Sequence, residues 1–242
     1  MNTYIKARKE VAELIGIELK ELNRVLYKEK VDNLYKTFNI PKKNGGVRVI
    51  HAPKDRLKYI QRKLSDKLAK IHQDYLDKNN IKSVISHGFQ KGKSIMTNAY
   101  VHNHKKFILN IDISDFFPSF NFGRVRGYFI KSKEFNFSKE VSTIIAQLAC
   151  HDGKLPQGAP TSPMISNLIF NIVDLRILAL AKKYKLDYTR YADDLSFSTN
   201  NKAFERIVDF LLVIGWILYF QYLLFLLCLF PLSNLVRLLF FL

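Results

Sequence analysis

Cysteine is scarce in this sequence, which contains only Cys150 and Cys228 among 242 residues. Two cysteines cannot supply the framework of several disulfides that holds small secreted domains together. Zinc sites need cysteines or histidines at short, regular spacing, and neither the cysteines nor the six histidines show such spacing. The sequence therefore excludes a disulfide scaffold and argues against a zinc site.

Acidic residues are also few, because Asp and Glu total 21 against 38 Lys and Arg, for a formal net charge of +17. A balance this basic favours a polyanionic partner, most simply nucleic acid. An AT-rich genome, in which lysine is frequent, would produce the same bias without any binding, so charge alone leaves both explanations open. The length suits one large domain or two small ones. The first residues lack the apolar core of a signal peptide, so we expect a cytoplasmic protein.

Hydrophobic periodicity and turn residues predict a mixture of helices and strands, that is, an α+β fold. Residues 1–37 carry apolar side chains at three- and four-residue spacing, which is typical of amphipathic helix. Residues 39–50 are predicted to form a β-hairpin, because Asn44-Gly45-Gly46 is a strong turn signal. The further elements that we expect are a helix after Asp55, a loop at 87–94, a helix from Ser94 past Asn98 and His102, a strand at 107–113, a Pro-rich loop at 154–163, a helix at about 164–183, and two strand arms around Asp193-Asp194.

Two adjacent carboxylates, Asp193 and Asp194, lie between two apolar, β-prone arms. Neighbouring side chains of a straight strand point to opposite faces, so these two share a site only if the chain turns between the arms. Together with Asp112, near the end of another predicted strand, such a turn would make a site for a hard cation that prefers oxygen ligands, above all Mg²⁺. The simpler alternative is a solvated Asp-Asp turn and a strand-end Asp that caps the next turn.

Three motifs occur in order along the chain: residues 111–118 (Ile-Asp-Ile-Ser-Asp-Phe-Phe-Pro), residues 155–163 (Leu-Pro-Gln-Gly-Ala-Pro-Thr-Ser-Pro) and Tyr191-Ala192-Asp193-Asp194. Their order and spacing resemble the palm motifs A, B and C of reverse transcriptases. Within that superfamily the chain resembles the bacterial retron-type enzymes, through supporting residues at 41–48, 87–89 and 98–102. The last motif would be a weak signal alone, but three palm motifs behind a fingers motif are specific. The resemblance covers residues 35–200.

The resemblance implies a right-hand polymerase fold with fingers and palm, in which an antiparallel palm sheet packs on helices. It places the fingers, with an N-terminal helical region, at residues 1–106. It places the palm, with all three motifs, at residues 107–209, and leaves an aberrant apolar tail at 210–242. Members of the family continue into a helical thumb after the third motif, and its expected polar residues do not follow here, so we expect the thumb to be missing.

The resemblance also implies roles for single residues. Asp112, Asp193 and Asp194 match the ligands of two Mg²⁺ ions. Phe117 matches the bulky residue that blocks a ribose 2′-OH and so favours deoxynucleotides. The remaining matches are Arg48 and Lys43 at the triphosphate, Gln157 and Gly158 beside the nucleotide and template, Tyr191 at the primer end, and Asn98 and His102 on a helix face that binds structured RNA.

The matched residues other than the carboxylates have structural alternatives as well. Phe117 and Tyr191 are also compatible with ordinary core aromatics. Lys43 and Arg48 are compatible with a solvated basic hairpin, and Gln157-Gly158 with a loop that only initiates a helix. Asn98 and His102 would equally well satisfy local polar groups.

Charge almost disappears from the end of the chain, where only Asp209 and Arg237 are charged after Ile207. Residues 210–230 are nearly all apolar and long enough to span a bilayer, which takes ~20 such residues. One interpretation is a membrane segment, which would be odd for the family that the chain resembles. We favour the other, in which a frameshift or premature end in the source gene replaced the native continuation, and we expect no membrane partner.

The predicted function is that of an RNA-directed DNA polymerase of retron type. Such an enzyme copies a structured non-coding RNA into DNA by two-Mg²⁺ nucleotidyl transfer, using an RNA template and primer and deoxynucleoside triphosphates, and yields an RNA–DNA hybrid. The retron resemblance further implies anti-phage defence and an effector protein as partner. The alternatives are a catalytically impaired nucleic-acid-binding remnant and a group II intron-type reverse transcriptase.

Overall fold

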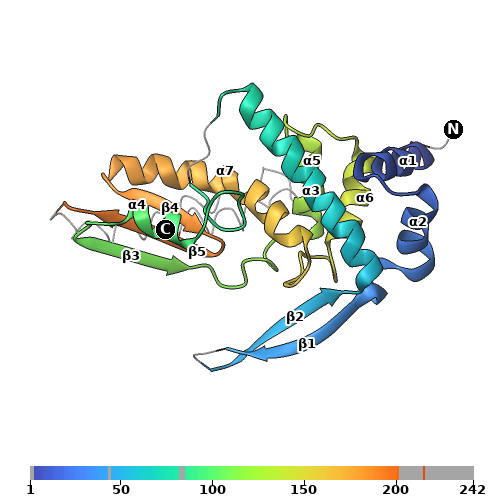
Figure 1. Ribbon diagram of the computed structural model, residues 1–242, viewed down its shortest axis with the longest axis horizontal. Helices are drawn as coiled ribbons and strands as arrows, with labels where there is room; N and C mark the ends of the chain where they lie inside the picture. The colour runs from blue at the N-terminus through green and yellow to red at the C-terminus, as the bar shows by residue number, and fades with distance from the viewer. Residues whose placement is uncertain (1–2, 43–44, 82–84, 202–214, 216–242) are drawn as a thin grey trace, which may run out of the picture.

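The computed structural model describes residues 3–42, 45–81, 85–201 and Gly215. Helices α1, α2, α3, α5 and α6 gather at one end of the molecule, and a three-stranded sheet forms the other end (Figure 1). Helix α7 runs from the sheet to the helical end, and a two-stranded hairpin extends away from the helices. The predicted mixture of helix and antiparallel sheet is confirmed. The predictions made for the apolar tail fall on residues 210–214 and 216–242, outside the described part of the chain.

The N-terminal region is helical, as predicted, but in several short pieces. These are α1 (Thr3–Ile15), α2 (Leu19–Asn23), a π-helical turn at Arg24–Glu29 and a 3₁₀ turn at Val31–Leu34. Lys30 adopts a φ of 62° between the last two turns, which interrupts the helical path. The predicted helical region to residue 37 is too long by three residues, because strand β1 already begins at Tyr35.

The predicted hairpin consists of β1 (Tyr35–Pro41) and β2 (Val47–Pro53). Its register pairs Tyr35 with Pro53 at the base and Pro41 with Val47 near the turn. Most of its side chains are exposed, so the hairpin extends into solvent and is anchored at its base. At that base, Gln61 Nε2 of α3 (Asp55–Lys78) donates to Tyr35 Oη and to the Leu148 carbonyl of α6, both at 2.7 Å.

The core of the helical end forms where α3 packs against three neighbouring helices. The buried face of α3 carries Leu57, Ile60, Leu64 and Leu68, which recur at the helical spacing that the sequence predicted. The helices α5 (Phe122–Lys131) and α6 (Lys139–Ala149) pack against each other, and α1 packs on α6. This body gives the hairpin a rigid support.

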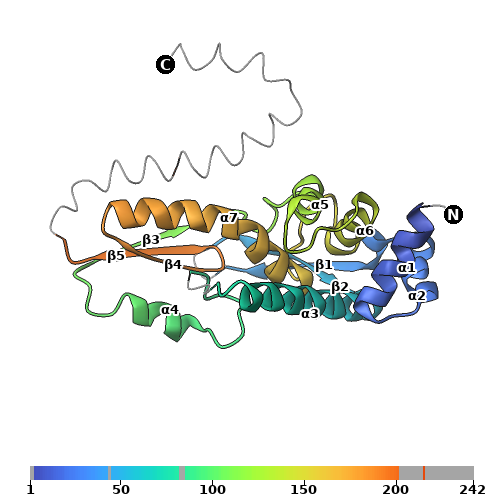
Figure 2. The same ribbon diagram turned by 90° about the horizontal axis from the view of Figure 1, so that it is seen from above.

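The sheet contains β3 (Phe107–Asp112), β4 (Asp187–Tyr191) and β5 (Asp194–Thr199), in the spatial order β3-β5-β4, with both pairs antiparallel. Figure 2 shows α7 (Thr161–Lys183) over one face of the sheet and the short helix α4 (Ile95–Val101) on the other side. The sheet is therefore held from both sides, and Asp193 in its β4–β5 turn lines one cavity with residues of β2.

Helix α7 is long and apolar enough to cross a membrane by length and composition, with a mean hydropathy of 1.7 in its most apolar window. However, 56% of that window is buried inside the protein, as in the core helix of a globular domain. The helix begins at Thr161, three residues before the predicted start. Pro163 lies in its first turn, where the missing proline N–H removes no helical hydrogen bond.

Candidate active site

Three carboxylates meet where β3 ends and the β4–β5 hairpin turns. Asp112, the last residue of β3, lies directly opposite Asp194, the first residue of β5. Ala192 and Asp193 form the turn, and the Ile113 N–H donates to the Asp193 carbonyl oxygen at 3.1 Å. The hairpin tip predicted from the sequence is thus confirmed, and it brings both adjacent aspartates to the end of the strand that carries Asp112.

The electrostatics of this tip favour a cation. Partial desolvation of its carboxyl raises the pKa of Asp194, and the negative charges of Asp193 and Asp112 raise it further. Carboxylates held this close repel each other unless a cation or a proton offsets the charge. Asp112 and Asp194 are exposed and Asp193 is half-buried, so each carboxylate is accessible to a cation. The donor set fits Mg²⁺, which prefers oxygen ligands.

A cleft of about 500 Å³ opens in front of the tip and reaches the hairpin. Asp112 and Asp193 line it on the side of the sheet, and Arg48 of β2 lines it on the hairpin side. Phe117 and Gln157 also line it, so the cleft unites five of the predicted site residues. Lys42 lies in the lining as well, whereas Lys43 falls outside the described residues. Acidic side chains of the tip and basic side chains of the hairpin therefore line one cavity.

Gly158 explains how the hairpin docks on the loop before α7. Its φ is +118°, and a Cβ on it would lie 2.9 Å from Ile50 Cγ2 and 3.0 Å from the His51 carbonyl oxygen. Next to it, the His51 N–H donates to the Gln157 carbonyl oxygen at 2.8 Å. The close backbone approach expected of Gly158 is present in the structure, and the chain that approaches it is β2. This contact docks the hairpin on the loop before α7.

Phe117 is half-buried at the floor of the cleft. Its ring contacts Phe116 edge-on, with centroids 5.4 Å apart, and lies 6.4 Å from the ring of Phe89. Phe117 thus has one side in an aromatic cluster and the other toward the cavity. Tyr191 is also half-buried and pairs with Asp194 across the hairpin. Tyr191 therefore lies beside Asp194, and Phe117 lines the cleft that Asp112 and Asp193 also line.

His102 and Asn98 lie away from solvent. His102 terminates α4, so the expected continuation of this helix past His102 is wrong. Its ring is hydrogen-bonded through Nδ1 to Ser198 Oγ and through Nε2 to Thr189 Oγ1, each at 2.7 Å. Burial lowers the pKa of His102. Among the structural and RNA-binding alternatives for this histidine, the geometry favours the structural one.

Three features of the site were not among the predicted site residues. Gly88 packs so tightly on the tip that a Cβ there would lie 2.5 Å from the Ala192 nitrogen, and the His-Gly-Phe motif was the available signal. Arg190 is fully buried beneath the tip. At the far edge of the cleft, candidate ligand atoms of Asp32, His151 and Asp152 lie within 4.8 Å of one another, although His151 and the Asp152 N–H already contact Asp32 Oδ1 at 3.1 Å.

Comparisons with known proteins agree with the motifs. The family described as reverse transcriptase (RNA-dependent DNA polymerase) matches residues 40–214. The chain is 35% identical over 224 residues to the retron Mx65 reverse transcriptase of Myxococcus xanthus, an alignment that covers 84% of this chain and 50% of that protein. It is 34% identical over 209 residues to the retron Ec86 reverse transcriptase of Escherichia coli, an alignment that covers 84% of this chain and 60% of that protein. The chain spans about half the length of the curated relatives it matches. These matches confirm the resemblance to retron-type reverse transcriptases.

Proposed function

Because this chain belongs to the reverse transcriptase (RNA-dependent DNA polymerase) family, we propose that it takes part in RNA-directed DNA synthesis of the retron type. The reaction is attack of a primer 3′-OH on a deoxynucleoside triphosphate paired with an RNA template. One observation carries the proposal: Asp112 and Asp193 line the same cleft as Arg48, with Asp194 directly opposite Asp112. Nucleotidyl transfer needs such an arrangement, since positioning and charge stabilisation provide most of its catalysis.

Asp112, Asp193 and Asp194 are proposed to hold two Mg²⁺ ions. Their mutual repulsion, which contributes to the raised pKa of Asp194, is the property that supports this assignment. When bound, such ions neutralise charge on the attacking and leaving oxygens. The protein's part is to hold three carboxylates at the tip of the sheet, two of which, Asp112 and Asp193, line the cleft.

Arg48 is proposed to bind the incoming triphosphate, because its planar guanidinium can donate two hydrogen bonds to phosphate oxygens. Lys43 would assist it from the hairpin turn. Phe117, half-exposed at the cleft floor, is proposed to lie where a ribose 2′-OH would clash with it. Gln157 and Gly158 would border the nucleotide and template, and Tyr191 the primer end.

The wider assignments follow from the same proposal. Residues 1–106 would act as fingers and residues 107–209 as palm. The substrate RNA would be a structured non-coding RNA, which suits the net charge of +17. Cytoplasmic location, an RNA–DNA hybrid product, an effector protein and a role in anti-phage defence belong to the proposal as features of a retron system. RNA contact by Asn98 and His102 would require them to act through α4 as a whole, since both are buried.

Primer extension on an RNA template tests the proposal with the full chain. Asp193→Asn should abolish Mg²⁺-dependent incorporation of deoxynucleotides while leaving RNA binding intact. Asp74→Asn, on the exposed face of α3, is the matched control and should extend as the unaltered chain does. Equal incorporation with and without Asp193 would refute the assignment. Salt-sensitive RNA binding without extension at any Mg²⁺ concentration would favour a non-catalytic RNA-binding protein.

A further inference from the structure

Arg190 lies in β4, two residues before the turn residue Ala192, and its side chain is 0% exposed. We propose that Arg190 is a positioning residue: its guanidinium, balanced by Asp174, holds the Ala192 carbonyl and so fixes the turn that places Asp193 and Asp194 against Asp112. The consequence for catalysis rests on the proposed function. The structural claim rests on the contacts of Arg190 alone.

One side of the guanidinium is anchored to α7. Arg190 Nε donates to both carboxylate oxygens of Asp174, at 3.0 and 3.1 Å, and Nη2 donates to Oδ2 at 2.8 Å. The Tyr188 hydroxyl donates to Asp174 Oδ1 at 2.7 Å. An arginine keeps its charge, so burying it is tolerable only where a carboxylate faces it with well-formed hydrogen bonds. Asp174, equally buried, provides this, and the pair fixes the guanidinium relative to the helix.

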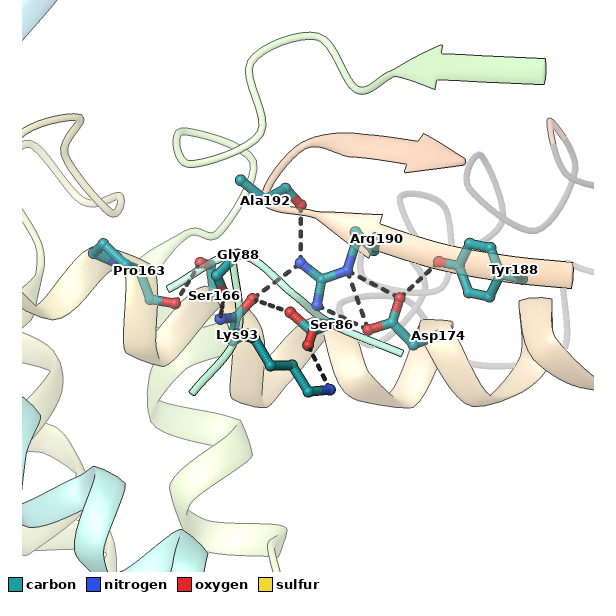
Figure 3. A network of polar contacts seen from close by, with 10 residues as sticks. Ser86, Gly88, Lys93, Pro163, Ser166, Asp174, Tyr188, Arg190 and Ala192 are labelled. Atoms are coloured by element: carbon teal, nitrogen blue, oxygen red, sulfur yellow. Dashed lines mark hydrogen bonds and ion pairs between the residues drawn. The ribbon is translucent and has the colours of Figure 1, made fainter. Parts of the chain in front are cut away.

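The remaining nitrogen points at the catalytic turn, as Figure 3 shows. Arg190 Nη1 donates to the Ala192 carbonyl oxygen at 2.8 Å and to Asn167 Oδ1 at 3.0 Å. Ala192 has a φ of +57°, a left-handed conformation that is unfavourable for a residue with a Cβ. The hydrogen bond orients the peptide between Ala192 and Asp193 and offsets part of that cost. The backbone direction of the first catalytic aspartate therefore depends on Arg190.

Neighbouring groups leave the guanidinium and the turn little freedom. The rings of Phe170 and Phe116 lie 4.8 and 5.9 Å from Arg190 Cζ, and Phe116 belongs to the loop that follows Asp112. On the other side of the turn, the Gly88 backbone meets Ala192, and Asn167 Nδ2 donates to the Gly88 carbonyl oxygen at 2.9 Å. Asn167 thus links the Gly88 segment to Arg190, and both contact the same turn residue.

Arginine is required here because two sites must be contacted at once. A planar fork binds Asp174 with one edge and reaches the Ala192 carbonyl with the other end. A lysine ammonium is a point charge on a flexible stem, so it can pair with Asp174 without orienting the turn. Arg190→Lys therefore keeps the buried charge and removes the contact that the proposal depends on.

Amide hydrogen exchange distinguishes a positioning role from general support. The Ile113 N–H, bonded to the Asp193 carbonyl at 3.1 Å, reports the position of the tip against β3. The His87 N–H, bonded to the Arg190 carbonyl at 2.7 Å, reports the docking of β4 itself. In the full chain with Arg190→Lys, exchange at Ile113 should accelerate at least ~10-fold while His87 keeps its protection. Loss of protection from exchange at both amides, or at neither amide, would overturn the proposal.

Arg176→Lys, at an exposed position on α7, is the matched control and should leave the exchange rate of both amides unchanged. Should Arg190→Lys fail to fold, the double variant Asp174→Leu/Arg190→Leu carries the test, because replacing both members of a buried ion pair by apolar residues is often neutral for stability. The same selective loss at Ile113 is expected, and equal protection of both amides would overturn the proposal. Failure of the proposed function would appear separately, as primer extension that survives Asp193→Asn, because the exchange measurement involves no catalysis.

Discussion

Asp112 and Asp194 lie directly opposite each other on neighbouring antiparallel strands, β3 and β5. Directly opposed residues in such a pair have Cβ atoms ~4.5–5.5 Å apart, and like charges there are destabilising. Asp193 adds a third negative charge at the adjacent turn, and burial together with both neighbours raises the pKa of Asp194. The arrangement costs folding stability when no cation is bound, so cation binding explains it better than folding does.

Arg48→Ala tests whether the hairpin binds the triphosphate. Hydrogen bonds to charged groups contribute about 1.5–3 kcal/mol, so the KM for deoxynucleoside triphosphates should rise roughly 10- to 100-fold, with a smaller change in kcat. Steady-state primer extension measures both constants. Arg62→Ala, exposed on α3, is the control and should leave KM unchanged. An unaltered KM in Arg48→Ala would show that Arg48 does not bind the triphosphate and is only a solvated side chain of the hairpin.

Phe117→Ala tests sugar selection. The half-buried ring is proposed to exclude a ribose 2′-OH, so its removal should lower the preference for deoxynucleotides over ribonucleotides by about 10-fold or more, within the range of single-pocket discrimination. Competing incorporation of the two nucleotide types gives the ratio directly. Phe137→Ala removes a ring that packs in the helical end and serves as control. A ratio that falls equally in both variants would point to lost packing alone.

Gly158→Ala should destabilise the protein by about 1–3 kcal/mol, since the residue has a φ of +118° and the new methyl group would meet Ile50 and His51. Urea unfolding measures the change in the free energy of unfolding. Gly127→Ala, within α5 and facing open space, should be neutral or stabilise by about 1 kcal/mol because alanine favours helix. Equal stabilities of the two variants would contradict the close contact between β2 and the Gly158 loop.

The elements around the site could be predicted where a local signal specified them. Asn44-Gly45-Gly46 specified the hairpin, and both described glycines of that turn have a φ of +83°. The Asp193-Asp194 pair between β-prone arms predicted the tip. Element boundaries were less accurate: β1 begins at Tyr35 because that side chain is held by Gln61, a partner 26 residues away, and no local pattern contains this information.

Arg190 shows why the rest of the site could not be predicted. A charged residue in a strand is expected to face solvent, because burying an unpaired charge is costly. Its burial depends on Asp174, which is brought beside it only when α7 packs on the sheet. Gly88 is similar, since its need for a small residue arises from Ala192, far along the chain. Both positions are specified by tertiary contacts rather than by local sequence.

His102 should make the stability of the protein depend on pH. Burial lowers its pKa in the folded state below the ordinary value of 6.5, while Asp187 and Lys105 act in opposite directions. The unfolded chain therefore binds a proton more readily, and the free energy of unfolding should fall as the pH drops below 6.5. Urea unfolding at pH 8 and pH 5.5 measures this dependence.

The contribution of His102 is isolated by comparison with two variants. His102→Gln cannot be protonated, so its stability deficit relative to the unaltered chain should be larger at pH 8 than at pH 5.5. His104→Asn, at an exposed position, should retain the pH dependence of the unaltered chain. A deficit in His102→Gln that is constant with pH would show that His102 is not held neutral.

The most direct test of the metal site is the affinity of the full chain for Mn²⁺, a paramagnetic substitute for Mg²⁺, measured by electron paramagnetic resonance. Asp112→Asn and Asp194→Asn should each weaken binding at least ~10-fold. Because both residues would hold the same ion, the double variant should lose little more Mn²⁺ affinity than either single variant. This is the non-additivity expected of coupled groups. Unchanged affinity in both single variants, or fully additive losses, would contradict a shared metal site at this pair.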